Sequence, residues 1–130
     1  MSEMFADTFY FLALWNPNDE AHARSVALSE TIRAPITTTH WVLVEIGDAL
    51  SAPAERGRTA EFLRSLLFSP DIEIVPASEL LFLRGLSLYA KRPDKSWSLT
   101  DCISFVVMEE KRLTEALTGD HHFEPAGFKA

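Results

Sequence analysis

The sequence predicts an α/β fold in which a short parallel sheet is covered by helices on both faces. Short apolar segments with strand character recur along the chain, and longer segments with helical periodicity lie between them. Clusters of Pro, Asn, Asp and Gly separate these segments and indicate turns. Strands that alternate with helices pair in parallel, because each helical crossover returns the chain to the same end of the sheet. The length of 130 residues, without a visible linker or repeat, predicts one domain over residues 1–130.

The first half of the chain is predicted to begin with a buried strand over residues 4–7. Residues 8–15 are apolar on all sides, so their periodicity leaves both strand and helix open. A turn at residues 16–19 follows, because Asn, Pro and Asp favour turns. The next predicted elements are a helix over 20–32, a strand over 35–37 and a helix from a cap at Thr38 or Thr39 to about residue 50. Another helix follows, capped by Ser51 and with Pro53 tolerated in its first turn.

The second half continues the same alternation. Pro70 ends the preceding helix, and Pro76 closes the strand that comes next, because proline lacks the backbone donor that both elements need. The predicted elements are a strand over 72–75, a helix from a cap at Ser78 through residue 90, a helix over 99–111 capped by Ser98, a strand over 113–117, and an exit loop over 119–122.

Acidic residues are predicted to meet at the carboxyl edge of this sheet. Asp7 ends the first strand and Asp120 follows the fourth, so both belong to that edge, where ligand sites of open sheets lie. Asp101 lies in the first turn of a helix entered from the same side, and Glu45 lies about two turns into the helix after the second strand. Carboxylates this close repel one another unless a hard cation is bound, and ligands that are all oxygen suit Mg²⁺ or Mn²⁺. Two such ions about 4 Å apart would stabilise both the attacking and the leaving oxygen of a phosphoryl displacement.

Each acid also has a purely structural explanation. Asp101 completes a variant of the capping box, and Asp7 is placed to cap a helix. Glu45 lies in a mostly apolar helix where an exposed glutamate is the usual case, and Asp48 is a rival for any role there. Asp120, after Gly119, is typical of a turn. The pattern alone leaves these alternatives open.

Several classes of protein are excluded or disfavoured. The net charge of −7 repels phosphates, so a nucleic acid would bind only where cations offset the acids. The chain has no Gly-rich GK[ST] segment for a P-loop and no Gly-rich first turn for a dinucleotide. A phosphotransferase of the haloacid dehalogenase type would need a second Asp where Phe9 stands. His121 and His122 have no partners at the spacing of a structural zinc site.

The sequence favours a cytoplasmic protein without a membrane segment. Its N-terminus has no basic region and no signal-type cleavage site, and the apolar run over residues 9–15 is too short to cross a bilayer. The single cysteine, Cys102, cannot form an internal disulfide and is typical of a small core residue.

Four segments in order along the chain support a family resemblance. They are FADT near the N-terminus, TTTHWVLVEIGDAL, SLTDCISFVVMEE and LTEALTGDHHFEPAGF. This pattern resembles the PIN domain family and, within it, the VapC-like ribonuclease toxins of toxin–antitoxin modules. The resemblance implies a three-layer α/β/α sandwich with a short parallel central sheet. It also implies an endoribonuclease that depends on Mg²⁺ or Mn²⁺ and cuts RNA by a two-metal type of hydrolysis.

The same resemblance assigns roles to individual residues. The catalytic and metal-binding acids would be Asp7, Glu45, Asp101 and Asp120. The accessory polar residues that line the site would be Thr8, Ser98 and Thr118. One departure is His122, which stands where some relatives carry a further acid.

The resemblance also implies partners. They are an RNA substrate such as tRNA or rRNA, a cognate antitoxin protein that blocks the acidic groove, and a second copy of the chain in a homodimer. The alternative hypothesis is a catalytically silent PIN-like domain that binds RNA or another protein and keeps its acids only for structure.

Overall fold

The computed structural model describes residues 3–31, 35–118, 123, 126 and 127 of the chain. At its centre, a parallel sheet of four strands has the order β3-β2-β1-β4. The strands are β1 (Met4–Ala6), β2 (Ile36–Thr39), β3 (Ile72–Val75) and β4 (Ala116–Leu117). The helices are α1 (Thr8–Trp15), α2 (His22–Thr31), α3 (His40–Ala49), the 3₁₀ helix η1 (Pro53–Glu55), α4 (Arg56–Leu67), α5 (Glu79–Lys91) and α6 (Leu99–Glu110).

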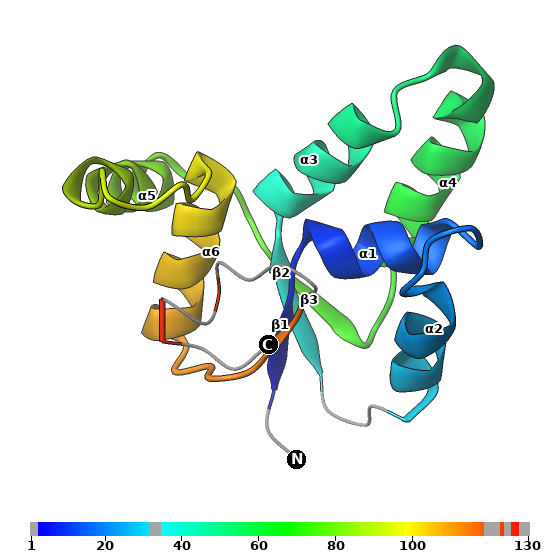
Figure 1. Cartoon of the computed structure of the whole chain (residues 1–130), viewed down its shortest axis with the longest axis horizontal. Coiled ribbons are helices and arrows are strands. Elements are labelled where there is room, and N and C mark those ends of the chain that lie inside the picture. The colour runs from blue at the N-terminus through cyan, green and yellow to red at the C-terminus, as the bar shows by residue number, and fades with distance from the viewer. Residues whose placement is uncertain (1–2, 32–34, 119–122, 124–125, 128–130) are drawn as a thin grey trace.

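Helices lie on both sides of the sheet, which confirms the predicted three-layer α/β fold. Figure 1 shows α5 and α6 on one side and α1 and α2 on the other, while α3 and α4 extend upward from the carboxyl end of the sheet. The chain passes from β1 to β2 to β3 in one direction and then returns to place β4 on the free side of β1. The direction of winding therefore reverses between β1 and β4, and open parallel sheets bind ligands at the carboxyl end of such a reversal. None of the helices in the described ranges is long and apolar enough to cross a membrane.

Side-chain caps explain where most helices begin. Residues 8–15, which the sequence left open, form α1 because the Asp7 carboxylate accepts a hydrogen bond from the backbone N–H of Tyr10. Thr39, rather than Thr38, caps α3, and the predicted caps Ser78 and Ser98 are confirmed.

The prediction that Ser51 caps a helix is wrong. The chain instead forms η1 after Ala52, with Pro53 in its first turn, and α4 then starts at Arg56 without a side-chain cap. Proline fixes its own φ angle and needs no donor in a first turn, so the turn begins at Pro53 rather than at the serine.

Three predicted strands have different limits, and the first differs only in ending at Ala6, one residue before Asp7. The second strand extends to Thr39, because Thr38 and Thr39 pair with Ile74 and Val75 of β3. The fourth strand is shorter than residues 113–117. Arg112 adopts a φ of 58°, and the N–H of Leu113 bonds to the carbonyl of Met108 at 2.8 Å, so Leu113 completes the end of α6 instead of pairing in the sheet.

Aromatic rings connect the sheet to the α6 layer. Trp97 contacts Phe105 at 5.0 Å between ring centroids, Phe105 contacts Phe123 at 4.9 Å, and Phe123 contacts Phe5 at 6.3 Å. All four rings are buried. Such edge-to-face and tilted pairs favour a fixed arrangement, so the segment that enters α6 is held against β1.

Candidate active site

Asp7 lies where β1 ends and α1 begins, at the carboxyl end of the sheet. Its side chain is only 6% exposed. One carboxylate oxygen, Oδ1, accepts the capping bond from the N–H of Tyr10 at 3.3 Å. The other, Oδ2, accepts a hydrogen bond from the hydroxyl of Thr118 at 2.6 Å. Asp7 is therefore a helix cap, as its structural explanation predicted. The cap uses only one of its two carboxylate oxygens, because the other is bonded to Thr118.

Thr118 reaches Asp7 because of the strand register. β1 and β4 pair in parallel with Ala6 opposite Leu117, so Asp7 and Thr118 are the next residues on the two chains. The N–H of Asp7 also bonds to the carbonyl of Leu117 at 3.4 Å. The two residues are 111 positions apart in the sequence, and they meet where the winding of the sheet reverses.

Glu45 is connected to the same corner by Thr8. The hydroxyl of Thr8, the residue directly after Asp7, donates a hydrogen bond to Oε1 of Glu45. Glu45 is half-buried, whereas Asp48, one turn further along α3, is exposed. Of the two acids that the sequence offered on α3, Glu45 is the one that faces α1 and the end of β1.

A further hydroxyl fixes the backbone just before Asp7, and sequence reasoning did not find it. The hydroxyl of Thr38 donates to the carbonyl of Ala6 at 2.8 Å. Thr37, Thr38 and Thr39 are all fully buried. The available signal was the run of three threonines that starts in the strand predicted over residues 35–37, because a buried hydroxyl needs a partner.

Asp101 and Ser98 form the predicted capping box at the start of α6. The N–H of Asp101 donates to the hydroxyl oxygen of Ser98 at 3.0 Å, and the N–H of Ser98 donates to Oδ2 of Asp101 at 3.1 Å. Asp101 is half-buried and Ser98 is exposed. The reciprocal bonds fix the rotamer of Asp101, so its carboxylate is oriented by the helix terminus.

Asp120, His121 and His122 lie outside the described residues. In the remainder, which covers 3–31, 35–118, 123, 126 and 127, no three His, Cys, Asp or Glu side chains form a group that could hold a metal ion. The structure thus connects Asp7 and Glu45 through threonines. Asp7 accepts a hydrogen bond from Thr118, and Glu45 accepts one from Thr8, the residue after Asp7. The meeting of all four acids stays a prediction.

Cys102 follows Asp101 but has the properties of a core residue. Its side chain is fully buried in α6 and forms no disulfide. Burial raises the pKa of the thiol, and the charge of Asp101 raises it further. A thiol needs a lowered pKa to act as a nucleophile, so the structure agrees with the predicted core role.

Comparison with known proteins identifies the fold family. The family model described as the PIN domain matches residues 4–129. The 23S rRNA-specific endonuclease VapC20 of Mycobacterium tuberculosis, represented by two strains, is 25% identical over 125 residues, which are 96% of this chain and 95% of that protein.

Two solved structures are similar over nearly the whole chain. The crystal structure of M. tuberculosis VapC20, described as a Sarcin-Ricin loop cleaving toxin, superposes with a TM-score of 0.88 at 24% identity, covering 98% of this chain and 96% of that one. VapBC2 from Rickettsia felis, bound to a DNA fragment from its promoter, superposes with a TM-score of 0.70 at 14% identity, covering 99% and 98%. From the family match and the fold, this chain belongs to the PIN domain family.

Proposed function

We propose that this chain is a metal-dependent endoribonuclease of the VapC type and the toxin of a toxin–antitoxin pair. The observation that supports it most is the placement of Asp7. This buried carboxylate lies where the winding of the sheet reverses, and it accepts a hydrogen bond from Thr118. The next residue, Thr8, donates a hydrogen bond to Glu45. Two acids fixed by hydroxyl donors at a ligand-binding edge are what a nuclease of this family needs, and the similarity to VapC20 gives the substrate class.

The chemistry of the predicted ligands supports a hard divalent cation. The donors offered by Asp7, Glu45 and Asp101 are carboxylate oxygens, and the neighbouring side chains of Thr8 and Thr118 are hydroxyls. Ligands that are all oxygen favour Mg²⁺ or Mn²⁺ over zinc or copper. We assign Asp7, Glu45, Asp101 and, beyond the described residues, Asp120 as the acids that hold the ion.

The protein residues prepare this site before the substrate arrives. Thr118 and Thr8 fix the orientation of the Asp7 and Glu45 carboxylates, as outer hydrogen bonds do for metal ligands in general. The capping box does the same for Asp101. When bound, the ion supplies a Lewis acid that offsets the charge developing on the scissile phosphate. No described side chain near these acids has the properties of a covalent nucleophile, so we propose direct hydrolysis that leaves a 5′ phosphate and a 3′ hydroxyl.

We further propose a structured rRNA as the substrate and a cognate antitoxin as the inhibitor. The relative VapC20 is named for action on 23S rRNA, and its structure is described as that of a Sarcin-Ricin loop cleaving toxin. The R. felis structure is a VapBC2 assembly, which supports an antitoxin partner here. The homodimer and the cytoplasmic site of action are parts of the same proposal.

The test is RNA cleavage by the purified chain in Mg²⁺, in Mn²⁺ and in chelator. The substrates are a sarcin–ricin loop hairpin, a scrambled hairpin of the same composition, and a tRNA mixture. The proposal expects cleavage that requires a divalent ion and products with 5′ phosphates. Cleavage that persists in chelator, or products that end in 2′,3′-cyclic phosphates, would contradict the proposed chemistry. Metal-independent RNA binding without cleavage of any substrate would instead support a silent binding domain.

A further inference from the structure

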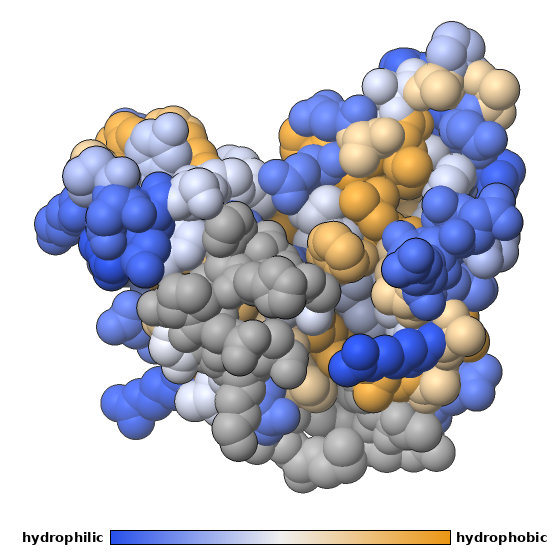
Figure 2. Space-filling view, viewed as in Figure 1, coloured by the Kyte–Doolittle hydropathy of each residue, from blue (hydrophilic) through white to orange (hydrophobic). Residues whose placement is uncertain are grey.

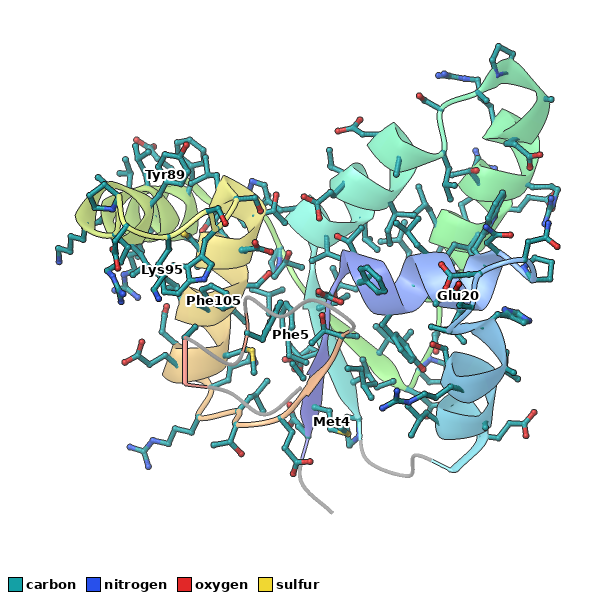
Figure 3. All side chains as sticks on the ribbon, viewed as in Figure 1. Met4, Phe5, Glu20, Tyr89, Lys95 and Phe105 are labelled. Atoms are coloured by element: carbon teal, nitrogen blue, oxygen red, sulfur yellow. The ribbon has the colours of Figure 1, made fainter. Side chains whose placement is uncertain are left out.

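A pocket of about 450 Å³ lies between the end of α5, the connection from α5 to α6, and the start of α6. The residues that line it and matter here are Tyr89, Arg92, Lys95, Ser96, Trp97 and Cys102. Figure 3 shows Tyr89 and Lys95 close to this connection, on the α5 side of the molecule. None of these residues has a role in the candidate active site described above.

The connection is positively charged in a chain that is otherwise acidic. Residues 89–97 carry three positive charges, Lys91, Arg92 and Lys95, against one negative charge, Asp94, whereas the whole chain has a net charge of −7. Figure 2 shows strongly hydrophilic residues gathered over this side of α5. A local basic surface on an acidic protein is where a polyanion can approach, because elsewhere the field repels it.

The cations of the pocket differ in how they are paired. Arg92 forms two bonds with Asp94, from Nε at 3.0 Å and from Nη2 at 2.9 Å, and its guanidinium lies 5.1 Å from the ring centroid of Trp97. The bonds from Arg92 lower the pKa of Asp94 to about 2, so this pair stays ionised. Lys95 is half-buried, and its ammonium forms no ion pair or side-chain hydrogen bond within the described part of the chain, although its charge also contributes to the lowered pKa of Asp94.

The two aromatic residues of the pocket differ in exposure. Trp97 is 6% exposed, and its indole nitrogen is buried without a hydrogen-bond partner among the residues that the structure describes, so a ligand in the pocket does not reach it. Tyr89 is 50% exposed and offers an aromatic face in the same pocket as Lys95.

The pocket is continuous along the chain with the start of α6. Ser98 follows the lining residue Trp97, and Asp101 precedes the lining residue Cys102. Ser98 and Asp101 form the capping box, with N–H to oxygen distances of 3.0 and 3.1 Å. The pocket therefore adjoins the first turn of α6, which carries Asp101. Unpaired nucleic acid is recognised by this combination of a cationic group for the phosphate and an aromatic face for the base.

We propose that this pocket binds one nucleotide of the substrate RNA next to the scissile bond, with Lys95 contacting its phosphate and Tyr89 stacking on its base. The proposal rests on the proposed ribonuclease function, since it takes RNA as the ligand. Lys95 and Tyr89 act in binding and positioning the strand and do not touch the reacting phosphate. Their loss raises KM and leaves kcat within about two-fold, because the interaction is equal in the ground and transition states.

The experiment measures binding of the full chain to a fluorescent sarcin–ricin loop hairpin by anisotropy, in the presence of chelator. The salt concentration is varied from about 25 to about 300 mM, so that the slope of affinity against salt reports the release of counterions. The variants are Lys95→Met, Lys95→Arg and Tyr89→Leu. The matched control is Arg64→Ala, which removes one exposed positive charge from α4, on the opposite side of the molecule. Cleavage in Mg²⁺ is measured with the same proteins and the same RNA.

Lys95→Met is expected to weaken binding about five- to ten-fold at low salt and to reduce the salt slope by about 0.7, the value for one phosphate contact on a single strand. Lys95→Arg and Arg64→Ala are expected to retain the slope. Tyr89→Leu is expected to weaken binding several-fold with an unchanged slope, because stacking releases no counterion.

Two results would overturn the pocket assignment. The first is a Lys95→Met variant that binds and cleaves like the wild type, while the wild type cleaves RNA. That result leaves the ribonuclease proposal intact. The second is a wild-type chain that fails to bind the hairpin even at low salt, which also rejects RNA as the ligand of the pocket. Failure of cleavage alone, with binding that depends on Lys95, would reject the ribonuclease proposal and keep the binding pocket.

Discussion

The hydroxyl of Thr118 donates a hydrogen bond of 2.6 Å to Oδ2 of Asp7 and so joins the ends of β4 and β1. The bond follows from the parallel register that places Ala6 opposite Leu117. It lies where the winding of the sheet reverses, and it holds a carboxylate that is 6% exposed. The position of Asp7 is therefore determined by a residue from the other end of the chain.

Thr118→Val tests whether this bond orients the carboxylate for catalysis. Valine keeps the shape of threonine but lacks the donor. We expect cleavage to fall about 10- to 100-fold, the usual effect of removing an outer hydrogen bond to a metal ligand. The free energy of unfolding should fall by about 1.5–3 kcal/mol, because the lost bond is to a charged group.

The control for this variant is Thr59→Val. Thr59 is also buried, and its hydroxyl donates to the carbonyl of Leu50 at 3.4 Å, between α3 and α4 and away from Asp7. It should lose stability but retain cleavage at a temperature well below unfolding. Equal losses of activity in the two variants would mean that Thr118 has only a structural role.

Ser98→Ala tests whether the carboxylate of Asp101 keeps its orientation when the helix cap is lost. The substitution removes the hydroxyl oxygen that accepts from the N–H of Asp101, whereas the backbone N–H of residue 98 still donates to Oδ2 of Asp101. It should therefore cost about 1 kcal/mol of stability and retain cleavage, measured under saturating Mg²⁺ well below the unfolding temperature. Ser78→Ala, which removes the cap of α5, is the matched control with the same expected loss of stability. A loss of cleavage in Ser98→Ala that Ser78→Ala does not share would mean that the hydroxyl of Ser98, and not its backbone N–H, positions Asp101.

Gly85→Ala tests the close approach of α5 to α6. A Cβ at residue 85 would lie 2.3 Å from Cγ1 and 3.2 Å from Cα of Ile103. Because the second atom belongs to the backbone, the helices must move apart, and we expect a loss of about 1–3 kcal/mol in urea unfolding. Gly57→Ala is the matched variant, since nothing lies within 4 Å of its added Cβ. It should be neutral or stabilising by about 0.4–1 kcal/mol, and a destabilised Gly57→Ala with an unaffected Gly85→Ala would refute this packing.

The thiol of Cys102 should be slow to react in the folded protein. Burial and the charge of Asp101 raise its pKa, so at a given pH a smaller fraction is thiolate than in an unfolded chain. Alkylation by iodoacetamide should therefore be slow at neutral pH, increase only in the alkaline range, and become fast in urea. Rapid alkylation of the native protein at neutral pH would contradict the buried position of the thiol.

The sequence predicted the order of the elements better than the way in which the site is held. Alternation of short strands and periodic helices was enough for the parallel sheet, and Ser78 and Ser98 were recognisable as caps because capping is a local effect. The cap at Ser51 was predicted wrongly because Pro53 offered a competing way to start a turn. Ser51 and Pro53 both favour the start of a helix in this loop, and the short segment does not show which of them the folded protein uses.

The partners of the acids depended on contacts that a sequence alone does not contain. The bond from Thr8 to Glu45 spans 37 positions, and it separates Glu45 from its rival Asp48. The family resemblance suggested Thr8 and Thr118 as residues that line the site, but the specific bonds appear only when β1, β4, α1 and α3 are assembled. Asp120 lies outside the described residues, so its place among the acids remains a prediction.

Asp7→Asn measures the central claim most directly. Asparagine is as good a helix cap as aspartate, so α1 and the fold should persist. The matched control is Asp48→Asn, which makes the same chemical change at an exposed position of α3. Cleavage of the sarcin–ricin loop hairpin under single-turnover conditions should fall in Asp7→Asn by more than the roughly 10- to 100-fold that removal of an outer partner of a metal ligand costs. It should remain at the wild-type rate in Asp48→Asn. A folded Asp7→Asn variant that cleaves as fast as the wild type would contradict the assignment of the active site to this corner of the sheet.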